Sequence, residues 1–310
     1  MASDLDTARE RPETIRAVPV RHPWRWVALA VIAIFVAMFV HLLVANPNFD
    51  WPTVRKYLFD PLILRGVWMT IKLTLLSMAI GIIIGIVVAV MRLSSNPIVA
   101  GVAWLYVWFF RGTPLLVQIT FWFAISALIK TISIGVPFGP SFWSKPTNSL
   151  ITLFVTALLA LSLNEGAYMS EIVRAGILAV DEGQTEAAHA LGMTRLQTMR
   201  RIVLPQAMRV IVPPTGNEVN NMLKNTALVS TIGMFELLRS AEAIFNANYK
   251  TIPLLIDAIF WYLLMTSAWQ VLQFYIERYY GRGSTRATSL TPIQKAKLMF
   301  AGMQHHGGIS

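Results

Sequence analysis

Charged side chains stand inside segments of this chain that are otherwise long runs of apolar residues. Arg111 interrupts an uncharged run from 98 to 129, and Glu165 ends another run. A charge at membrane depth costs about 2.5–3.5 kcal/mol on insertion scales, so such residues usually face a cavity or a partner. Arg111 could pair with the carboxylate of a bound solute, and Glu165 with its ammonium group or basic side chain. Alternatively, both residues pair inside the fold, with each other or with Glu171 and Lys224.

A second polar feature is a stripe of amides and one lysine at positions i, i+3, i+4, i+7 and i+8. Its members are Asn217, Asn220, Asn221, Lys224 and Asn225. This spacing places them on one helical face. The face could line the path of a solute, or it could hold neighbouring helices together by hydrogen bonds. Pro213 and Pro214, just before it, can break the helix and free carbonyl groups toward a cavity.

Several kinds of chemistry lack their residues in this sequence. There are no cysteines, which excludes disulfides, a thiol nucleophile and a cysteine-bound metal. The histidines show no H-E-x-x-H or other metal-ligand spacing, and no G-x-S-x-G turn appears. We therefore expect no metal, no cofactor and no catalytic set, which disfavours a membrane-embedded enzyme.

The elements that must position these polar residues are membrane spans. Of the 310 residues 55% are apolar and 14% are charged, against roughly 25% charged in a typical soluble domain. Since a span needs about 20 residues, we expect an all-α integral membrane protein with six spans. They lie near 26–45, 73–91, 98–129, 149–165, 210–235 and 252–276.

Two of these spans have special features. The 98–129 run is too long for one straight span, so it should tilt, extend beyond the membrane or bend near Gly112-Thr113-Pro114. Gly81 and Gly85 stand four residues apart in another span, a spacing that permits close helix packing.

The basic residues predict the orientation of the chain. Most of the 26 lysine and arginine residues fall in the tails at 1–25 and 281–310 and in the loop at 174–209. Because cytoplasmic loops concentrate Lys and Arg, we expect both termini and this loop in the cytoplasm. The net charge of +10 is then explained by topology, and nucleic acid is not expected as a partner.

The loop at 181–205 predicts a helical hairpin. Thr185 can cap a helix that starts at Glu186, and Gly192 should end it with a positive φ. Thr194 can cap a second helix with an apolar side. Such a rigid unit suits docking into a groove on another protein. An amphipathic hairpin that lies on the membrane would explain the same pattern.

The same loop carries a longer motif. It reads Glu186-Ala187-Ala188, three residues, Gly192, nine residues, Ile202, one residue, Leu204-Pro205. At every motif position it resembles the EAA motif of the membrane subunits of ATP-binding-cassette importers. Three further segments resemble one branch of that family, the polar amino-acid permeases for histidine, glutamate, glutamine, arginine and opines. These segments are 111–118, 164–177 and 224–230, and the whole resemblance covers about residues 66–280.

This resemblance implies a binding-protein-dependent, type I permease in the bacterial plasma (inner) membrane. Its five-span core would occupy 66–280, after an additional N-terminal span at 26–45 and an extracytoplasmic linker at 46–65. The implied partners are an ATPase dimer, an extracytoplasmic solute-binding protein, a second permease copy or similar subunit, and the lipid bilayer. The chain itself would be no enzyme, because the ATPase subunits bind ATP; it has no G-x-x-x-x-G-K-[ST] loop.

Two sets of site residues follow. The residues expected to couple the permease to the ATPase are Glu186, Ala187, Ala188, Gly192, Ile202, Leu204 and Pro205. The candidate solute path is Arg111, Thr113, Gln118, Glu165, Asn217, Asn221, Lys224 and Asn225. The predicted function is an amino-acid permease, and the alternative is a secondary transporter or channel that uses the intramembrane charges for ion coupling. The pattern leaves open which amino acid is carried and whether the dimer is homomeric.

Overall fold

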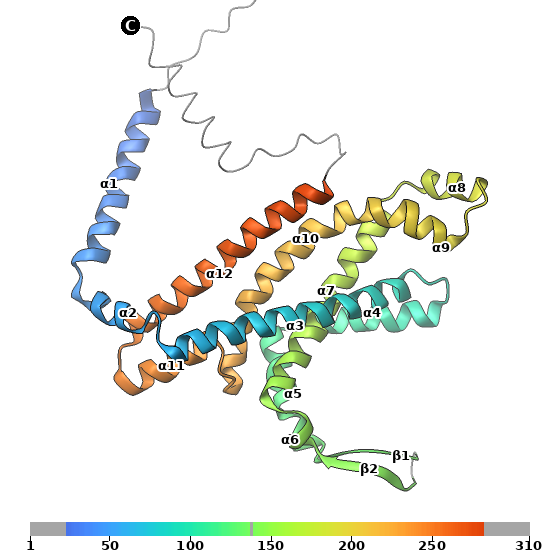
Figure 1. Cartoon of the computed structure of the whole chain (residues 1–310), viewed down its shortest axis with the longest axis horizontal. Coiled ribbons are helices and arrows are strands. Elements are labelled where there is room, and N and C mark those ends of the chain that lie inside the picture. Colours follow the sequence, from blue (N-terminus) through green and yellow to red (C-terminus); the bar gives the residue numbers. More distant parts are fainter. Residues whose placement is uncertain (1–22, 137–138, 282–310) are drawn as a thin grey trace, which may run out of the picture. The chain divides into compact units, whose positions relative to one another are not determined.

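The structure, a computed structural model, describes residues 23–136 and 139–281. These residues form helices almost throughout, with one two-stranded hairpin (Figure 1). They divide into two compact units between Asp50 and Trp51. The predicted tails at 1–25 and 281–310 lie outside the described residues, apart from 23–25 and 281.

The N-terminal unit consists of α1 (Pro23–Ala45) and the short 3₁₀ helix η1 (Pro47–Phe49). Within α1, Trp26–Ala45 is long and apolar enough to cross a membrane. The helix ends where Asn46 takes an extended conformation before Pro47, as expected for a residue that precedes proline. The side chain of Asn46 then accepts a hydrogen bond from the Asn48 backbone and begins η1.

The second unit holds the remaining elements. Its first helices are α2 (Trp51–Tyr57), α3 (Pro61–Arg92), α4 (Pro97–Gly112), α5 (Leu115–Leu128), α6 (Thr147–Leu150) and α7 (Leu153–Leu178). The antiparallel strands β1 (Thr131–Gly135) and β2 (Ser141–Pro146) lie between α5 and α6. Then come α8 (Glu182–Ala190), α9 (Arg195–Thr198), the π-helical turn η2 (Met199–Val203), α10 (Leu204–Asn225), the 3₁₀ segment η3 (Thr226–Ile232), α11 (Leu237–Asn248) and α12 (Thr251–Tyr280). The predicted linker at 46–65 thus contains η1, α2 and the start of α3.

Length and composition identify the spans. In the part of the chain that the structure describes, four single helices qualify, namely Trp26–Ala45 within α1 and the whole of α3, α7 and α12. The pair α4 and α5 qualifies as a fifth span that bends by 105°. The 98–129 run therefore bends at Gly112-Thr113-Pro114. The expected span at 210–235 corresponds to α10 followed by η3; the 22 residues of α10 are enough to cross a membrane, although its polar face makes it less apolar than the other spans.

The helices α3 and α7 pack closely because glycines remove the side chains between them. A Cβ atom on Gly81 would lie 2.6 Å from Cγ of Glu165, and one on Gly85 would lie 2.5 Å from Cβ of Met169. The expectation of close packing at these two glycines is confirmed. Around this contact lies the larger apolar core of the unit, which α3, α5, α7, α10 and η3 share.

The helix α10 continues through Pro213 and Pro214 without a break, contrary to expectation. Prolines are tolerated inside membrane helices where neighbouring helices support the backbone. Here α12 supplies that support, because Nε1 of Trp269 donates to the carbonyl of Gly216 at 2.7 Å. Nε2 of Gln273 donates to the carbonyl of Pro213 at 3.4 Å.

Candidate functional site

A cavity of about 740 Å³ lies between the α4–α5 break, α7 and α10. Its lining consists of Arg111, Gly112, Thr113, Pro114, Leu115, Asn164, Glu165, Tyr168, Glu218, Asn221, Lys224 and Asn225. Two side chains in this set are cationic and two are carboxylates. A cavity with both charges suits a solute that itself carries both signs.

The α4–α5 break supplies one wall of the cavity. α4 ends at Gly112, Thr113 is extended, and Pro114 comes directly before α5. Proline restricts the residue before it to extended conformations, so the break falls at Thr113. The hydroxyl of Thr113 donates to the carbonyl of Phe109 at 2.8 Å, which satisfies one of the carbonyls left free at the end of α4.

Arg111 is fixed against α7. The carbon Cζ of its guanidinium lies 5.2 Å from the centre of the Tyr168 ring, within the range of a cation–π interaction. The described residues form three salt bridges, and none of them involves Arg111. Its guanidinium is therefore not held in a direct ion pair by these residues.

Glu165 is only 4% exposed and lines the same cavity from α7. Its Oε1 atom has no hydrogen-bond partner among the residues that the structure describes. Glu165 is also absent from the three salt bridges found there. The alternative that it pairs with Arg111 or Lys224 inside the fold is thus not realised in this structure.

Two predicted path residues lie elsewhere. Gln118 is buried behind the break, where it donates hydrogen bonds to Phe110 and Thr113, and it does not line the cavity. Asn217 turns toward α12, and its Oδ1 accepts a hydrogen bond from Gln273 at 3.3 Å. The structure brings together the remaining candidates, Arg111, Thr113, Glu165, Asn221, Lys224 and Asn225.

Six lining residues were not among the candidates, and three of these, Asn164, Tyr168 and Glu218, have polar side chains. Asn164 and Tyr168 lie on the cavity side of α7 beside Glu165. Helical spacing would have found Tyr168, which stands three residues after Glu165. Glu218 stands three residues before Asn221 and lines the cavity where Asn217 does not. The face of α10 that lines the cavity therefore includes Glu218 with Asn221, Lys224 and Asn225, and leaves out Asn217 and Asn220.

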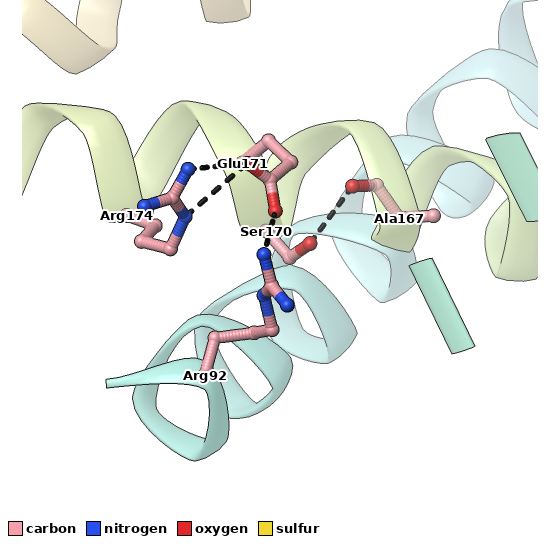
Figure 2. Close-up of polar contacts among 5 residues, drawn as sticks. All are labelled: Arg92, Ala167, Ser170, Glu171 and Arg174. Carbon is pink, nitrogen blue, oxygen red and sulfur yellow. Dashed lines mark hydrogen bonds and ion pairs between the residues drawn. The ribbon is translucent and has the colours of Figure 1, made fainter. Parts of the chain in front are cut away.

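An ion cluster ties α3 to α7 away from this lining. In Figure 2, Oε2 of Glu171 accepts hydrogen bonds from Arg174, at 3.2 Å from Nε and 2.8 Å from Nη2. Its Oε1 lies 3.5 Å from Nη2 of Arg92, the last residue of α3. Glu171 therefore makes its direct ion pairs with these two arginines and not with Arg111.

A helical hairpin lies at the far end of α7 from the strands (Figure 1). α8 begins at Glu182, earlier than the expected start at Glu186, because Asp181 caps it and accepts a hydrogen bond from the Gly183 backbone at 2.7 Å. Gly192 ends the helix with φ +78°, as predicted. Thr194 caps α9, also as predicted, in a capping box with Gln197.

The tip of this hairpin presents apolar side chains. Leu191 is 83% exposed and Leu196 77% exposed, on either side of Gly192. Glu186, Ala187, Gly192, Leu204 and Pro205 are also exposed, Ile202 is half-buried, and Ala188 is buried. Glu186, Ala187 and Gly192 thus lie exposed on the hairpin and Ala188 packs inward, while Ile202, Leu204 and Pro205 follow the hairpin in η2 and at the start of α10.

The sequence matches one family over most of its length. Residues 81–280 match the family described as binding-protein-dependent transport system inner membrane component. The chain is 47% identical to the arginine transport system permease protein ArgU of Corynebacterium glutamicum, over 93% of this chain and 89% of that protein. It is 41% identical to the nopaline transport system permease protein NocM of Agrobacterium fabrum, over 66% of this chain and 82% of that protein.

A solved structure shows the same fold. The chain resembles a crystal structure of an amino acid ABC transporter with histidines, with a TM-score of 0.60 and 38% sequence identity. The match covers 71% of this chain and 95% of that one. The chain therefore belongs to the inner-membrane components of binding-protein-dependent transport systems, as a permease subunit of an amino-acid ATP-binding-cassette importer.

Proposed function

We propose that this permease imports basic amino acids, with arginine as the leading candidate. The observation that carries the proposal is Glu165, a buried carboxylate on the cavity wall that has no salt-bridge partner among the described residues. A guanidinium group stays charged at any physiological pH and matches a carboxylate through two parallel hydrogen bonds. The arginine permease that is 47% identical to this chain supports the same substrate.

The substrate would lie between Arg111 and Glu165. Arg111 binds its α-carboxylate, while Glu165 binds the cationic side chain, with Glu218 as a second carboxylate on the wall. Thr113 and Asn225 add neutral hydrogen-bonding groups. A path that must release its solute needs few and weak contacts. In this cavity only Glu165 would bind the cationic side chain directly.

Partner subunits would supply the energy. The hairpin α8–α9 docks into a groove on an ATPase dimer, with Leu191 and Leu196 as its apolar contacts. The ATPase subunits bind and hydrolyse ATP, and a solute-binding protein delivers the amino acid from the opposite side. A second permease, identical or similar, completes the pore. Both termini lie in the cytoplasm, following the distribution of Lys and Arg.

The test replaces Glu165 by glutamine, which keeps the shape and removes the charge. Equilibrium binding of radiolabelled arginine is measured on the purified permease–ATPase complex without the solute-binding protein, so that the permease alone determines affinity. A hydrogen bond to a charged group contributes about 1.5–3 kcal/mol. Glu165→Gln should therefore weaken arginine binding roughly 10- to 100-fold. Binding of glutamine should change little, because that substrate has no side-chain charge.

The matched control is Glu242→Gln, which removes one negative charge on α11, outside the cavity. It should leave arginine affinity unchanged. Equal arginine affinity of Glu165→Gln and wild type, in a complex that assembles normally, would refute the proposed substrate contact. A loss of arginine and glutamine binding to the same degree would point to a structural role for Glu165 instead.

A further inference from the structure

Two buried amide side chains hold the α4–α5 break. Gln118, in the first turn of α5, is 4% exposed, and Asn164, in the middle of α7, is 8% exposed. Their amide groups contact each other, since Nδ2 of Asn164 donates to Oε1 of Gln118 at 3.2 Å. The pair thus joins the helix that follows the break to the helix that carries Glu165.

Both amides also bind the backbone just before the break. Nε2 of Gln118 donates to the carbonyl of Phe110 at 2.9 Å, to the carbonyl of Thr113 at 3.1 Å and to Oγ1 of Thr113 at 2.7 Å. Nδ2 of Asn164 donates to the same Phe110 carbonyl at 2.9 Å. The last carbonyls of a helix have no partner inside it, and a buried carbonyl without a partner is costly. The amide pair supplies those partners where α4 stops.

The backbone groups that accept these bonds lie on both sides of Arg111 in the sequence. Phe110 precedes it and Thr113 follows it by two residues, so the amide pair fixes the backbone on both sides of the guanidinium. Tyr168, which lies under that guanidinium, stands one helical turn after Asn164 on α7. The backbone contacts and the cation–π contact therefore attach one short segment to one face of one helix.

We propose that Gln118 and Asn164 are positioning residues that hold the break in its 105° geometry and so set the distance between Arg111 and Glu165. Gln118 acts from behind the cavity lining, through the backbone, and does not touch the solute. The effect on substrate affinity rests on the proposed function, in which Arg111 and Glu165 hold the two ends of an amino acid. The effect on the break does not depend on the substrate.

The test uses Gln118→Met, which keeps the length of the side chain and removes its amide. Because the chain has no cysteines, spin labels can be placed at Val102→Cys on α4 and Phe121→Cys on α5, both exposed. Electron paramagnetic resonance on the whole permease–ATPase complex then reports the distance between the two labels across the break. Variants with only one of the two cysteines show which measured distances arise between subunits, so that these can be set aside. We expect Gln118→Met to broaden or shift the distance within the subunit. Thr120→Val, which removes an exposed side-chain bond to the Leu116 carbonyl on the same helix, should not.

A second measurement separates positioning from general damage. Gln118→Met should weaken arginine binding about tenfold, the loss expected for a misplaced charged contact. In an Arg111→Ala background the same change should cause no further loss, because the group being positioned is gone. Asn164→Ser removes the other amide and leaves only a short hydroxyl in its place, and it should reproduce both results.

The outcomes are distinguishable. An unchanged distance across the break in both variants overturns the positioning role, even if Glu165→Gln weakens arginine binding as proposed. Additive losses in the double variant with Arg111→Ala overturn it as well. A complex that fails to assemble with either Gln118→Met or Asn164→Ser also overturns it, because the pair would then be needed for the fold itself. A changed distance together with normal arginine binding in Glu165→Gln keeps the control of the break but removes the proposed substrate.

Discussion

Glu165 reaches the cavity because the residue opposite it on α3 has no side chain. A Cβ atom at position 81 would lie 2.6 Å from Cγ and 2.8 Å from Cβ of Glu165. The Cβ of Glu165 is fixed to its backbone, so a side chain at 81 could be accommodated only by a shift of α7 or of α3. Gly81 therefore decides where this carboxylate sits.

Replacing Gly81 by alanine should displace Glu165. Overpacking of a tight contact costs typically 1–3 kcal/mol, so the melting temperature of the complex should fall. Arginine affinity should fall with it. Gly101→Ala on α4 is the control, because nothing lies within 4 Å of its added methyl group and alanine favours helix. If Gly81→Ala and Gly101→Ala melt and bind alike, the contact at 81 does not position Glu165.

The residue types predicted which charged side chains line the cavity better than they predicted which neutral side chains do. Arg111 and Glu165 could be identified from the sequence because a charge inside an apolar run is costly unless it faces a cavity or a partner. Gln118 was misplaced for a physical cause: an amide next to a break can serve the solute or the free carbonyls of the helix, and only the fold shows which. Asn217 lies at the edge of the stripe on α10, where a small rotation turns it from the cavity to Gln273 of α12.

At the scale of single elements, the turn between α8 and α9 depends on the backbone conformation of Gly192. Gly192 has φ +78°, and an added Cβ there would meet no atom within 4 Å. Strain from a substitution at 192 would therefore come from the backbone alone. Asparagine and aspartate both tolerate this conformation better than other side chains do, and they differ mainly in charge.

The pair Gly192→Asn and Gly192→Asp separates backbone from charge. Gly192→Asn should retain most of the import in proteoliposomes, at a cost of about 1 kcal/mol in hairpin stability. Gly192→Asp places a charge between Leu191 and Leu196, where the ATPase groove would leave it without a partner. It should lower import well below that of Gly192→Asn. Equal import by the two variants would show that the tip does not enter a groove.

The start of a helix is hard to predict where two nearby residues can both act as its N-cap. Thr185 and Asp181 can each begin a helix, and the structure uses Asp181, which also places a negative charge at the first turn of α8. The continuity of α10 through Pro213 and Pro214 depends on Trp269 and Gln273, donors from a helix far along the chain. Local sequence can mark a weak point in a helix, but it cannot show what supports it.

For the whole molecule, the distribution of Lys and Arg predicts which ends face the cytoplasm. Cysteines at Phe142 on β2 and at Leu196 on α9, each 77% exposed, give one probe for each side. In cells that lack the ATPase subunits, which would otherwise cover Leu196, a membrane-impermeant maleimide should label Phe142→Cys in intact spheroplasts, and Leu196→Cys only after the membrane is opened. The unmodified chain has no cysteine and serves as the blank. The reverse pattern would invert the proposed orientation.

The class of protein followed from composition more directly than the position of each span did. A high apolar fraction made an integral membrane protein the clear prediction. The segment 210–235 is less apolar than the other expected spans, and it corresponds to α10 and η3. The polar face of α10 lines the cavity and contacts α12, which explains why this span has fewer apolar residues.

The helix α7 forms one continuous rod between the cavity and the hairpin α8–α9 (Figure 1). Glu165 lies about 20 Å along the axis from Leu178, at a rise of about 1.5 Å per residue. The close contacts at Gly81 and Gly85, together with the ion pair between Arg92 and Glu171, bind this rod to α3 along its length. A lever of that length magnifies small rotations. A tilt of about 10° about its hairpin end would carry Glu165 sideways by about 3.5 Å, longer than a hydrogen bond. A rotation of about 10° at the hairpin would therefore be enough to make or release the proposed contact with the solute.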